Sequence, residues 1–309
     1  MDQPPMESLE PVPAKKRRWL PVVIGVAVCL LVAAALAGGV ILYLRSHRSA
    51  PSLPPASSTD TTTAAPPPNT VRVTVPEGYT VDEIAALLEQ SGVCAAADFY
   101  QAVQTADISA YAFAADLPAD AEGRAFRLEG YLFPDTYEFY LNCSGEAALR
   151  RFLDNFENRL APYTEQLGNR SLDDVVTFAS IVQAEVGYAQ DMKRVARVLQ
   201  NRLDNPAEYP KLQCDTGWGY LKKLQASPSG VTFDKDAYDM YTCRGLPVGA
   251  IGNPGLAALL AALSPSDEEE VEGCYFFATD YTTGITYYSK TYAQHMAVCR
   301  EHSIGVHAD

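Results

Sequence analysis

A glutamate interrupts an apolar helix face in the stretch FASIVQAEVGY, residues 178–188. Phe178, Ile181 and Val182 have the spacing of one α-helical face, and Glu185 is the next position on that face. Because apolar surroundings disfavour the charged form of a carboxyl group, the pKa of Glu185 is expected to be raised. A carboxyl that keeps its proton near neutral pH can act as a general acid, so Glu185 is the candidate catalytic residue.

A structural role for the same glutamate is the alternative. The next predicted helix, residues 191–203, carries Arg194, Arg197 and Arg202, any of which could hold the carboxylate in an ion pair. The pattern alone leaves the two interpretations open.

The helix that carries Glu185 has recognisable ends in the sequence. Ser171 can cap its N-terminus, and Asp173 and Asp174 suit the positive end of the helix dipole. Gly187 follows shortly after Glu185 and is expected to end the helix. Glu185 is therefore expected in the last turn, facing the interior or the lip of a cleft.

The N-terminal part of the chain is predicted to anchor the protein in the cell membrane. Residues 19–44 carry no charge and are long enough to cross a bilayer about 30 Å thick, and this stretch is longer than the core of a cleaved signal peptide. Basic residues cluster at 15–18, which favours a cytoplasmic tail (1–18), a single pass and an extracytoplasmic body. Residues 45–70, rich in Pro, Ser and Thr, are predicted to be a disordered linker.

Charge and cysteine content exclude some partners and leave other questions open. The net charge of −14 argues against nucleic acid as a partner, because binding it usually requires a basic face. Metal-ligating residue types occur near the C-terminus, but their spacing matches no familiar zinc site, so no metal or other cofactor is expected: His295, Cys299, His302 and His307. The sequence does not determine how the cysteines outside the predicted span would pair: Cys94, Cys143, Cys214, Cys243, Cys274 and Cys299.

The folded body is predicted to begin with a small unit at residues 71–125. Alternating valines at 71–75 predict a short strand, and Thr80 with Glu83 has the spacing of a capping box that begins a helix. A second helix is predicted from Ala96 to Val103. This order resembles the LysM-like module of cell-wall proteins, and the alternative is a packing subdomain that binds nothing.

A larger domain is predicted at residues 126–309, which makes the fold class α+β. The segment LEGYLFPDTYEFY, residues 128–140, is dense in aromatic residues and suits either a core or a carbohydrate cleft. Residues 211–220 and 238–255 are expected to form loops, and residues 274–295 are expected to form a hairpin followed by a helix.

Several of these segments occur in an order that resembles a known family. After the anchor and the LysM-like unit come LEGYLFPDTYEF, ASIVQAEV, VARVLQNRL, LQCD, GLPVGAIGNPG, YFFATD and SKTYAQH, which resemble the MltG (YceG-like) endolytic murein transglycosylases. The resemblance implies a lysozyme-like (YceG) catalytic domain. It also implies peptidoglycan glycan strands as substrate, and penicillin-binding proteins and other cell-wall synthesis proteins as partners.

The resemblance also implies roles for particular residues. Glu185 matches the single catalytic acid of the family, and the implied substrate-binding residues are Gln213, Asp215, Tyr241, Asn253, Glu129 and Tyr137. This chain departs from the family pattern beside the acid, where Gln183 replaces a first acidic residue and Val186 replaces a threonine. It departs again where the usual LQSDPT reads LQCDTG.

The implied reaction is an endolytic cleavage of the MurNAc–GlcNAc bond that leaves 1,6-anhydro-MurNAc ends and terminates nascent strands. One carboxylate suffices for it, whereas ordinary glycosidases use two. Two alternatives remain, namely a non-catalytic peptidoglycan-binding scaffold and a muramidase with a second acid such as Asp215 or Glu129.

Overall fold

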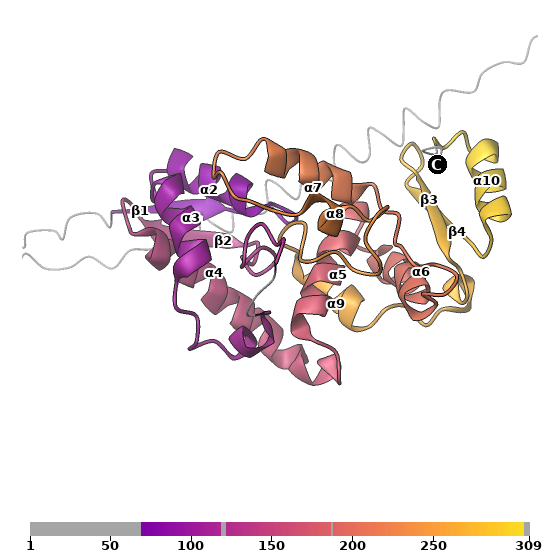
Figure 1. Cartoon of the computed structure of the whole chain (residues 1–309), viewed down its shortest axis with the longest axis horizontal. Helices are drawn as coiled ribbons and strands as arrows, with labels where there is room; N and C mark the ends of the chain where they lie inside the picture. The colour runs from indigo at the N-terminus through magenta and orange to yellow at the C-terminus, as the bar shows by residue number, and fades with distance from the viewer. Residues whose placement is uncertain (1–68, 119–121, 187, 306–309) are drawn as a thin grey trace, which may run out of the picture. The chain divides into compact units, whose positions relative to one another are not determined.

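The computed structural model describes residues 69–118, 122–186 and 188–305 (Figure 1). Within these ranges the chain combines helices with two antiparallel two-stranded sheets, which confirms a mixed fold of helices and strands. The predicted cytoplasmic tail, the membrane span at 19–44 and nearly all of the linker lie outside the described residues. In the described ranges, no helix has the length and apolar character needed to cross a bilayer.

The first elements are strand β1 (Thr70–Thr74), helix α2 (Val81–Gln90) and helix α3 (Ala96–Thr105). The predicted capping box is confirmed, because Thr80 accepts a hydrogen bond from the backbone of Glu83 while the Glu83 side chain accepts one from the backbone of Thr80. Ile84 and Leu88 on the inner face of α2 are fully buried.

Strand β1 pairs with strand β2 (Thr136–Tyr140), and Val73 lies opposite Tyr137. Helix α4 (Gly145–Leu160) follows β2 and packs against α3, and the short 3₁₀ helices η1 (Ala112–Asp116) and η2 (Ala161–Leu167) lie before β2 and after α4. The LysM likeness and the domain boundary at 125/126 stay predictions. The structure adds that the strand closing this unit comes from beyond that boundary.

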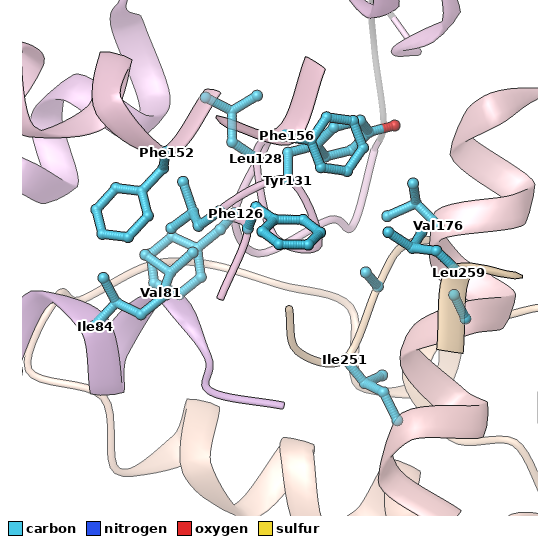
Figure 2. Close-up of a cluster of buried hydrophobic side chains, with 14 of the residues drawn as sticks. Val81, Ile84, Phe126, Leu128, Tyr131, Phe152, Phe156, Val176, Ile251 and Leu259 are labelled. Atoms are coloured by element: carbon cyan, nitrogen blue, oxygen red, sulfur yellow. The ribbon is translucent and has the colours of Figure 1, made fainter. Parts of the chain in front are cut away.

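Most aromatic residues of the segment 128–140 belong to the core, part of which Figure 2 shows, whereas Tyr140 at its end is exposed. Leu128, Tyr131 and Leu132 are fully buried, and the Tyr131 ring stacks on Phe113 at 5.2 Å between centroids. The same core continues through α4, helix α5 (Leu172–Glu185), the later loop and helix α9 (Leu256–Leu263), with Phe152, Phe156, Val176, Ile251 and Leu259 among its residues. Burial of this aromatic area is a major favourable contribution to folding.

The helices around Glu185 are α5 (Leu172–Glu185), α6 (Met192–Asp204) and α9 (Leu256–Leu263), and α5 packs against both others. Ser171 caps α5 as predicted, accepting hydrogen bonds from the backbone N–H groups of Asp173 and Asp174. Helix α6 lies within one residue of its predicted range at both ends.

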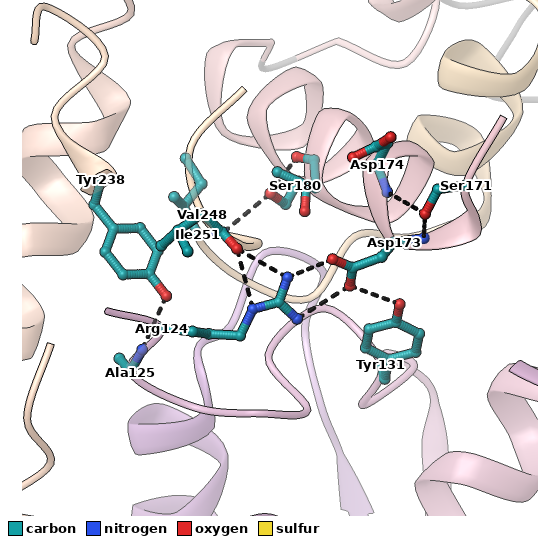
Figure 3. A network of polar contacts seen from close by, with 11 residues as sticks. Arg124, Ala125, Tyr131, Ser171, Asp173, Asp174, Ser180, Tyr238, Val248 and Ile251 are labelled. Carbon is teal, nitrogen blue, oxygen red and sulfur yellow. Dashed lines mark hydrogen bonds and ion pairs between the residues drawn. The ribbon is translucent and has the colours of Figure 1, made fainter. Parts of the chain in front are cut away.

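Arg124 connects the start of α5 with the loop before α9, through a buried ion pair to the helix and hydrogen bonds to the loop (Figure 3). The Arg124 guanidinium pairs with the Asp173 carboxylate and also donates to the carbonyl oxygen of Val248 at 2.9 Å. Tyr131 donates to the same carboxylate at 2.9 Å. Farther along α5, the Ser180 hydroxyl accepts a hydrogen bond from the backbone N–H of Ile251. The predicted loop 238–255 is therefore shaped by contacts with one face of α5.

Helix α7 (Thr216–Gln225) corrects the prediction that residues 211–220 form only a loop. Gly217 and Gly219 lower the helix propensity of this stretch, but Tyr220, Leu221 and Leu224 are buried on one face and stabilise it. The short helix α8 (Lys235–Tyr238) follows.

The C-terminal part is a hairpin of β3 (Phe276–Asp280) and β4 (Ile285–Ser289), followed by α10 (Tyr292–Glu301), as predicted (yellow in Figure 1). The 3₁₀ helix η3 (Glu269–Val271) precedes it, and β3 contacts α6.

Candidate active site

Glu185 is the last residue of α5, and the residue is half-buried. Its Oε1 accepts a hydrogen bond of 2.7 Å from the Thr216 hydroxyl at the start of α7. Burial among protein atoms raises the pKa of the Glu185 carboxyl, the hydrogen bond from Thr216 partly opposes this, and the nearby charge of Asp215 adds to it. The expected direction of the pKa shift is confirmed.

The three arginines considered as partners for Glu185 bind elsewhere. Arg194 pairs with Glu268 at 2.7 Å, and Arg197 donates to the carbonyl oxygen of Ser266. Arg202 donates to the side chain of Gln213. Among the residues that the structure describes, no ion pair joins Glu185 to an arginine. The interpretation as an arginine-held structural carboxylate is thus not supported.

Glu185 faces a cavity of about 290 Å³ between α5, α6, the loop before α7 and the β3–β4 hairpin. Three of the predicted substrate-binding residues line this cavity with it: Gln213, Asp215 and Tyr241. The lining also includes aromatic residues from the C-terminal part of the chain: Tyr275, Phe276, Tyr281, Tyr292 and His295. A lining that combines polar and aromatic side chains is suited to a ligand with many hydroxyl groups.

Gln213 is held in an unusual backbone conformation beside Arg202. Its φ of 56° lies in the left-handed region, and its N–H donates to the carbonyl oxygen of Met240 at 3.0 Å. Arg202 lies over the rings of Tyr209 and Phe276, with its guanidinium carbon 5.3 Å and 5.5 Å from their centroids. These contacts connect α6, the motif around Gln213 and the hairpin on one side of the cavity.

Asp215 and Tyr241 are joined directly. The Tyr241 hydroxyl donates to Asp215 Oδ1 at 2.6 Å, and the Tyr241 ring stacks on Trp218 at 4.5 Å between centroids. The motif 212–217 and the loop 238–255 therefore both contribute polar groups to the lining of the cavity that Glu185 faces.

The other three predicted substrate-binding residues, Glu129, Asn253 and Tyr137, do not line this cavity. Glu129 accepts hydrogen bonds from the backbone N–H of Val81, the Tyr220 hydroxyl and the Asn253 amide. Burial raises the pKa of Glu129 to about 8.

Asn253 and Tyr137 also have partners inside the protein. Asn253 Oδ1 accepts from the backbone N–H groups of Gly130 and Leu132, at 2.9 and 2.8 Å, and the buried Tyr137 donates to the carbonyl oxygen of Phe133. Substrate contact by Glu129, Asn253 and Tyr137 stays a prediction.

The two departures beside the acid have clear structural partners. Gln183 points to a different neighbour from Glu185, because its Oε1 accepts a hydrogen bond from the backbone N–H of Gly255 at 3.0 Å. Val186 carries no hydroxyl, and Thr216 supplies one to the carboxylate instead. Sequence reasoning did not identify Thr216 or Trp218, because their contacts with Glu185 and Tyr241 come from segments separate in the sequence.

No metal site is expected from the sequence. Among the described residues, no group of histidine, cysteine and acidic side chains is arranged to hold a metal ion. His307, one of the four residues considered as ligands, lies outside the described residues. His295 stacks on Phe276, and His302 stacks on Tyr287. The six described cysteines are free thiols.

Comparison with known proteins gives one consistent set of relatives. The sequence model of the YceG-like family matches residues 50–301. The endolytic murein transglycosylase of Streptococcus pneumoniae serotype 2 (strain D39 / NCTC 7466) is 28% identical over 248 residues, 74% of this chain and 44% of that protein. That of Bacillus subtilis (strain 168) is 28% identical over 174 residues, 54% of this chain and 46% of that protein.

A solved structure agrees with these relatives. The crystal structure of a YceG-like protein from Listeria monocytogenes superposes with a TM-score of 0.62 at 28% identity, over 74% of this chain and 75% of that chain. The chain spans less than half the length of the curated relatives it matches.

Proposed function

Because the chain belongs to the YceG-like family, we propose that it is a peptidoglycan lytic transglycosylase with Glu185 as its catalytic acid. It cleaves the MurNAc–GlcNAc bond inside glycan strands and leaves 1,6-anhydro-MurNAc ends. The names of the relatives in Streptococcus pneumoniae and Bacillus subtilis support the reaction class, and the geometry around Glu185 supports the assignment of the residue.

In the first step, Glu185 acts as a general acid. Its protonated carboxyl gives its proton to the oxygen that links MurNAc to GlcNAc, and the bond from that oxygen to MurNAc C1 breaks. The sugar passes through an oxocarbenium-like state, and the GlcNAc side leaves with a free hydroxyl group. A carboxyl whose pKa is raised by desolvation is suited to this step, because the shift favours the protonated form that a general acid needs.

In the second step, the same carboxylate acts as a base. It takes the proton of the MurNAc C6 hydroxyl while that oxygen bonds to C1, so the ring closes to the 1,6-anhydro product and no water is consumed. The Thr216 hydroxyl stabilises the ionised form of Glu185 between the two steps. Because the attacking hydroxyl belongs to the same sugar, its proximity replaces a second catalytic carboxylate.

The observation that carries this proposal is the Glu185 carboxyl, which has a raised pKa and no arginine partner in the described residues, and which faces a cavity lined by polar and aromatic residues. The test is product analysis after incubation with purified glycan strands. Lytic transglycosylation predicts anhydro-MurNAc ends, detected by mass spectrometry as products that lack one water relative to hydrolysis products. Reducing MurNAc ends, or no cleavage at all, would contradict it.

A two-carboxylate muramidase is the second candidate, and the position of Asp215 favours it. Asp215 lines the same cavity as Glu185, and its charge raises the Glu185 pKa, so the two carboxylates interact. Glu129, the other second acid considered, lies outside this cavity. Reducing ends among the products would favour this candidate, whereas strand binding without cleavage would favour a non-catalytic scaffold.

The cellular setting completes the proposal. The uncharged stretch 19–44 and the basic residues before it support a single-pass anchor in the cell membrane with the catalytic part outside the cytoplasm. An enzyme held there would meet nascent strands beside penicillin-binding proteins and other cell-wall synthesis proteins, and would terminate strand elongation by internal cleavage.

A further inference from the structure

Trp218 is an exposed aromatic residue whose ring is held in a defined orientation. It lies near the start of α7, and 42% of its side chain is exposed. The ring stacks on Tyr241 with 20° between the planes, and the indole N–H donates to Asp239 Oδ1 at 3.0 Å. An exposed tryptophan fixed by a stack and a hydrogen bond loses little conformational entropy when a ligand packs on it.

The Trp218 ring is linked to the cavity of Glu185 through Tyr241. Tyr241 lines that cavity and donates to Asp215, and Thr216 on the same short segment donates to Glu185. A ligand that extends from the cavity past Tyr241 would therefore reach the Trp218 ring.

Two more exposed aromatic rings line the cavity, those of Tyr281 and Tyr292, which are 75% and 51% exposed. Several exposed rings around one acidic group are suited to a long chain of repeating units, rather than to a small ligand that the cavity would enclose.

We propose that Trp218 forms an additional sugar-binding position, where the apolar C–H face of one N-acetylhexosamine ring packs on the indole outside the cavity of Glu185. A single indole offers a flat apolar surface of about the size of one sugar ring and far smaller than the roughly 800 Å² per partner of a typical protein interface. This inference rests on the proposed function, since it concerns the same glycan strand.

The tryptophan content of the chain allows a direct test. The sequence contains two tryptophans, Trp19 and Trp218, so the full-length Trp19→Phe variant has Trp218 as its only tryptophan. Combined with Glu185→Gln to slow cleavage, this protein is titrated with peptide-free glycan fragments of increasing length. We expect short fragments to leave the fluorescence almost unchanged, and longer fragments to shift the emission and protect the indole from quenching by acrylamide.

Binding by ring variants gives the second measurement. Trp218→Ala should weaken the binding of long fragments by about tenfold, comparable to the loss of an aromatic stacking partner in single-stranded nucleic-acid binding, and should leave short fragments unaffected. Trp218→Phe should restore much of the loss. Tyr140→Ala is the control, because Tyr140 is 69% exposed and does not line the cavity of Glu185.

The outcomes separate this inference from the proposed function. If Trp218 only supports Tyr241, Trp218→Ala weakens short and long fragments equally, and the proposal is overturned. Unchanged fluorescence at every length, with anhydro-ended products still released by the wild-type protein, overturns the Trp218 position and leaves the function standing. Absence of both cleavage and binding in the wild-type protein overturns the function itself.

Discussion

The Thr216 hydroxyl donates a hydrogen bond of 2.7 Å to Oε1 of Glu185. This bond joins the start of α7 to the end of α5, and it stabilises the ionised form of an acid whose pKa is raised by burial. The two effects oppose each other, and this suits a group that must release a proton and then recover one.

Replacing Thr216 by valine should raise the pKa of Glu185 further, because the ionised carboxylate loses a hydrogen-bond donor. Cleavage requires protonated Glu185 at the start, so the alkaline limb of the pH profile of kcat/KM should move to higher pH. Thr216→Ser keeps the hydroxyl and should keep the wild-type profile. A profile that does not move in Thr216→Val would show that another group sets this limb.

Glu185→Gln should reduce cleavage by at least about a hundredfold, because it removes the proton that the reaction transfers. The variant should not melt at a lower temperature near neutral pH, since it removes a carboxyl that burial makes costly to ionise. Glu185→Asp should also lose activity, because its carboxylate is one methylene shorter. Release of anhydro-muropeptides and thermal unfolding are measured together. An active but destabilised Glu185→Gln protein would contradict the assignment.

Glu129 should make the stability of the fold depend on pH. Burial raises its pKa from 4.5 to about 8, and the nearby charges of Asp82 and Glu83 add to the effect. The folded state therefore holds this proton more tightly than the unfolded state. The stability that it contributes is fully present below pH 4.5 and is lost as the pH rises through about 8.

Glu129→Gln resembles the protonated form and should flatten this dependence when melting temperature is followed between pH 5 and pH 9, a range chosen to bracket the shift. Asp135→Asn is a surface carboxylate control, since its pKa is lowered rather than raised. Full cleavage activity in Glu129→Gln would also count against the predicted role of Glu129 in substrate binding.

Arg124→Met should destabilise the fold by about 3 kcal/mol or more, because it leaves the buried Asp173 carboxylate without its cation. The double variant Arg124→Met/Asp173→Leu should recover part of that loss, although Tyr131 then also lacks its acceptor. Denaturant unfolding of both variants measures the effect. Equal loss in the single and double variants would contradict a coupled ion pair.

The topology proposal is tested with protease on intact, wall-stripped cells. A cytoplasmic N-terminus and an exported body predict that protease removes everything beyond about residue 50. Protection of the body, with a cytoplasmic marker protein as the control for cell integrity, would contradict it.

Local patterns in the sequence were enough to predict several features. The capping box of Thr80 and Glu83, the Ser171 cap and the hairpin near the C-terminus depend on neighbours within a few residues, and all are present in the structure. The raised pKa of Glu185 also followed from periodicity, because one α-helical face determines which side chains surround it.

Tertiary structure decided which polar residues meet in space. The resemblance implies that Glu129 and Glu185 are both site residues. In the folded chain, however, Glu129 is hydrogen-bonded to residues of α2 and α7, whereas Glu185 lines the cavity. The donor to Glu185 is 31 positions away in the sequence, and β1 finds its partner strand 62 or more positions away. Such contacts depend on how whole elements pack, which the local spacing of residues does not encode.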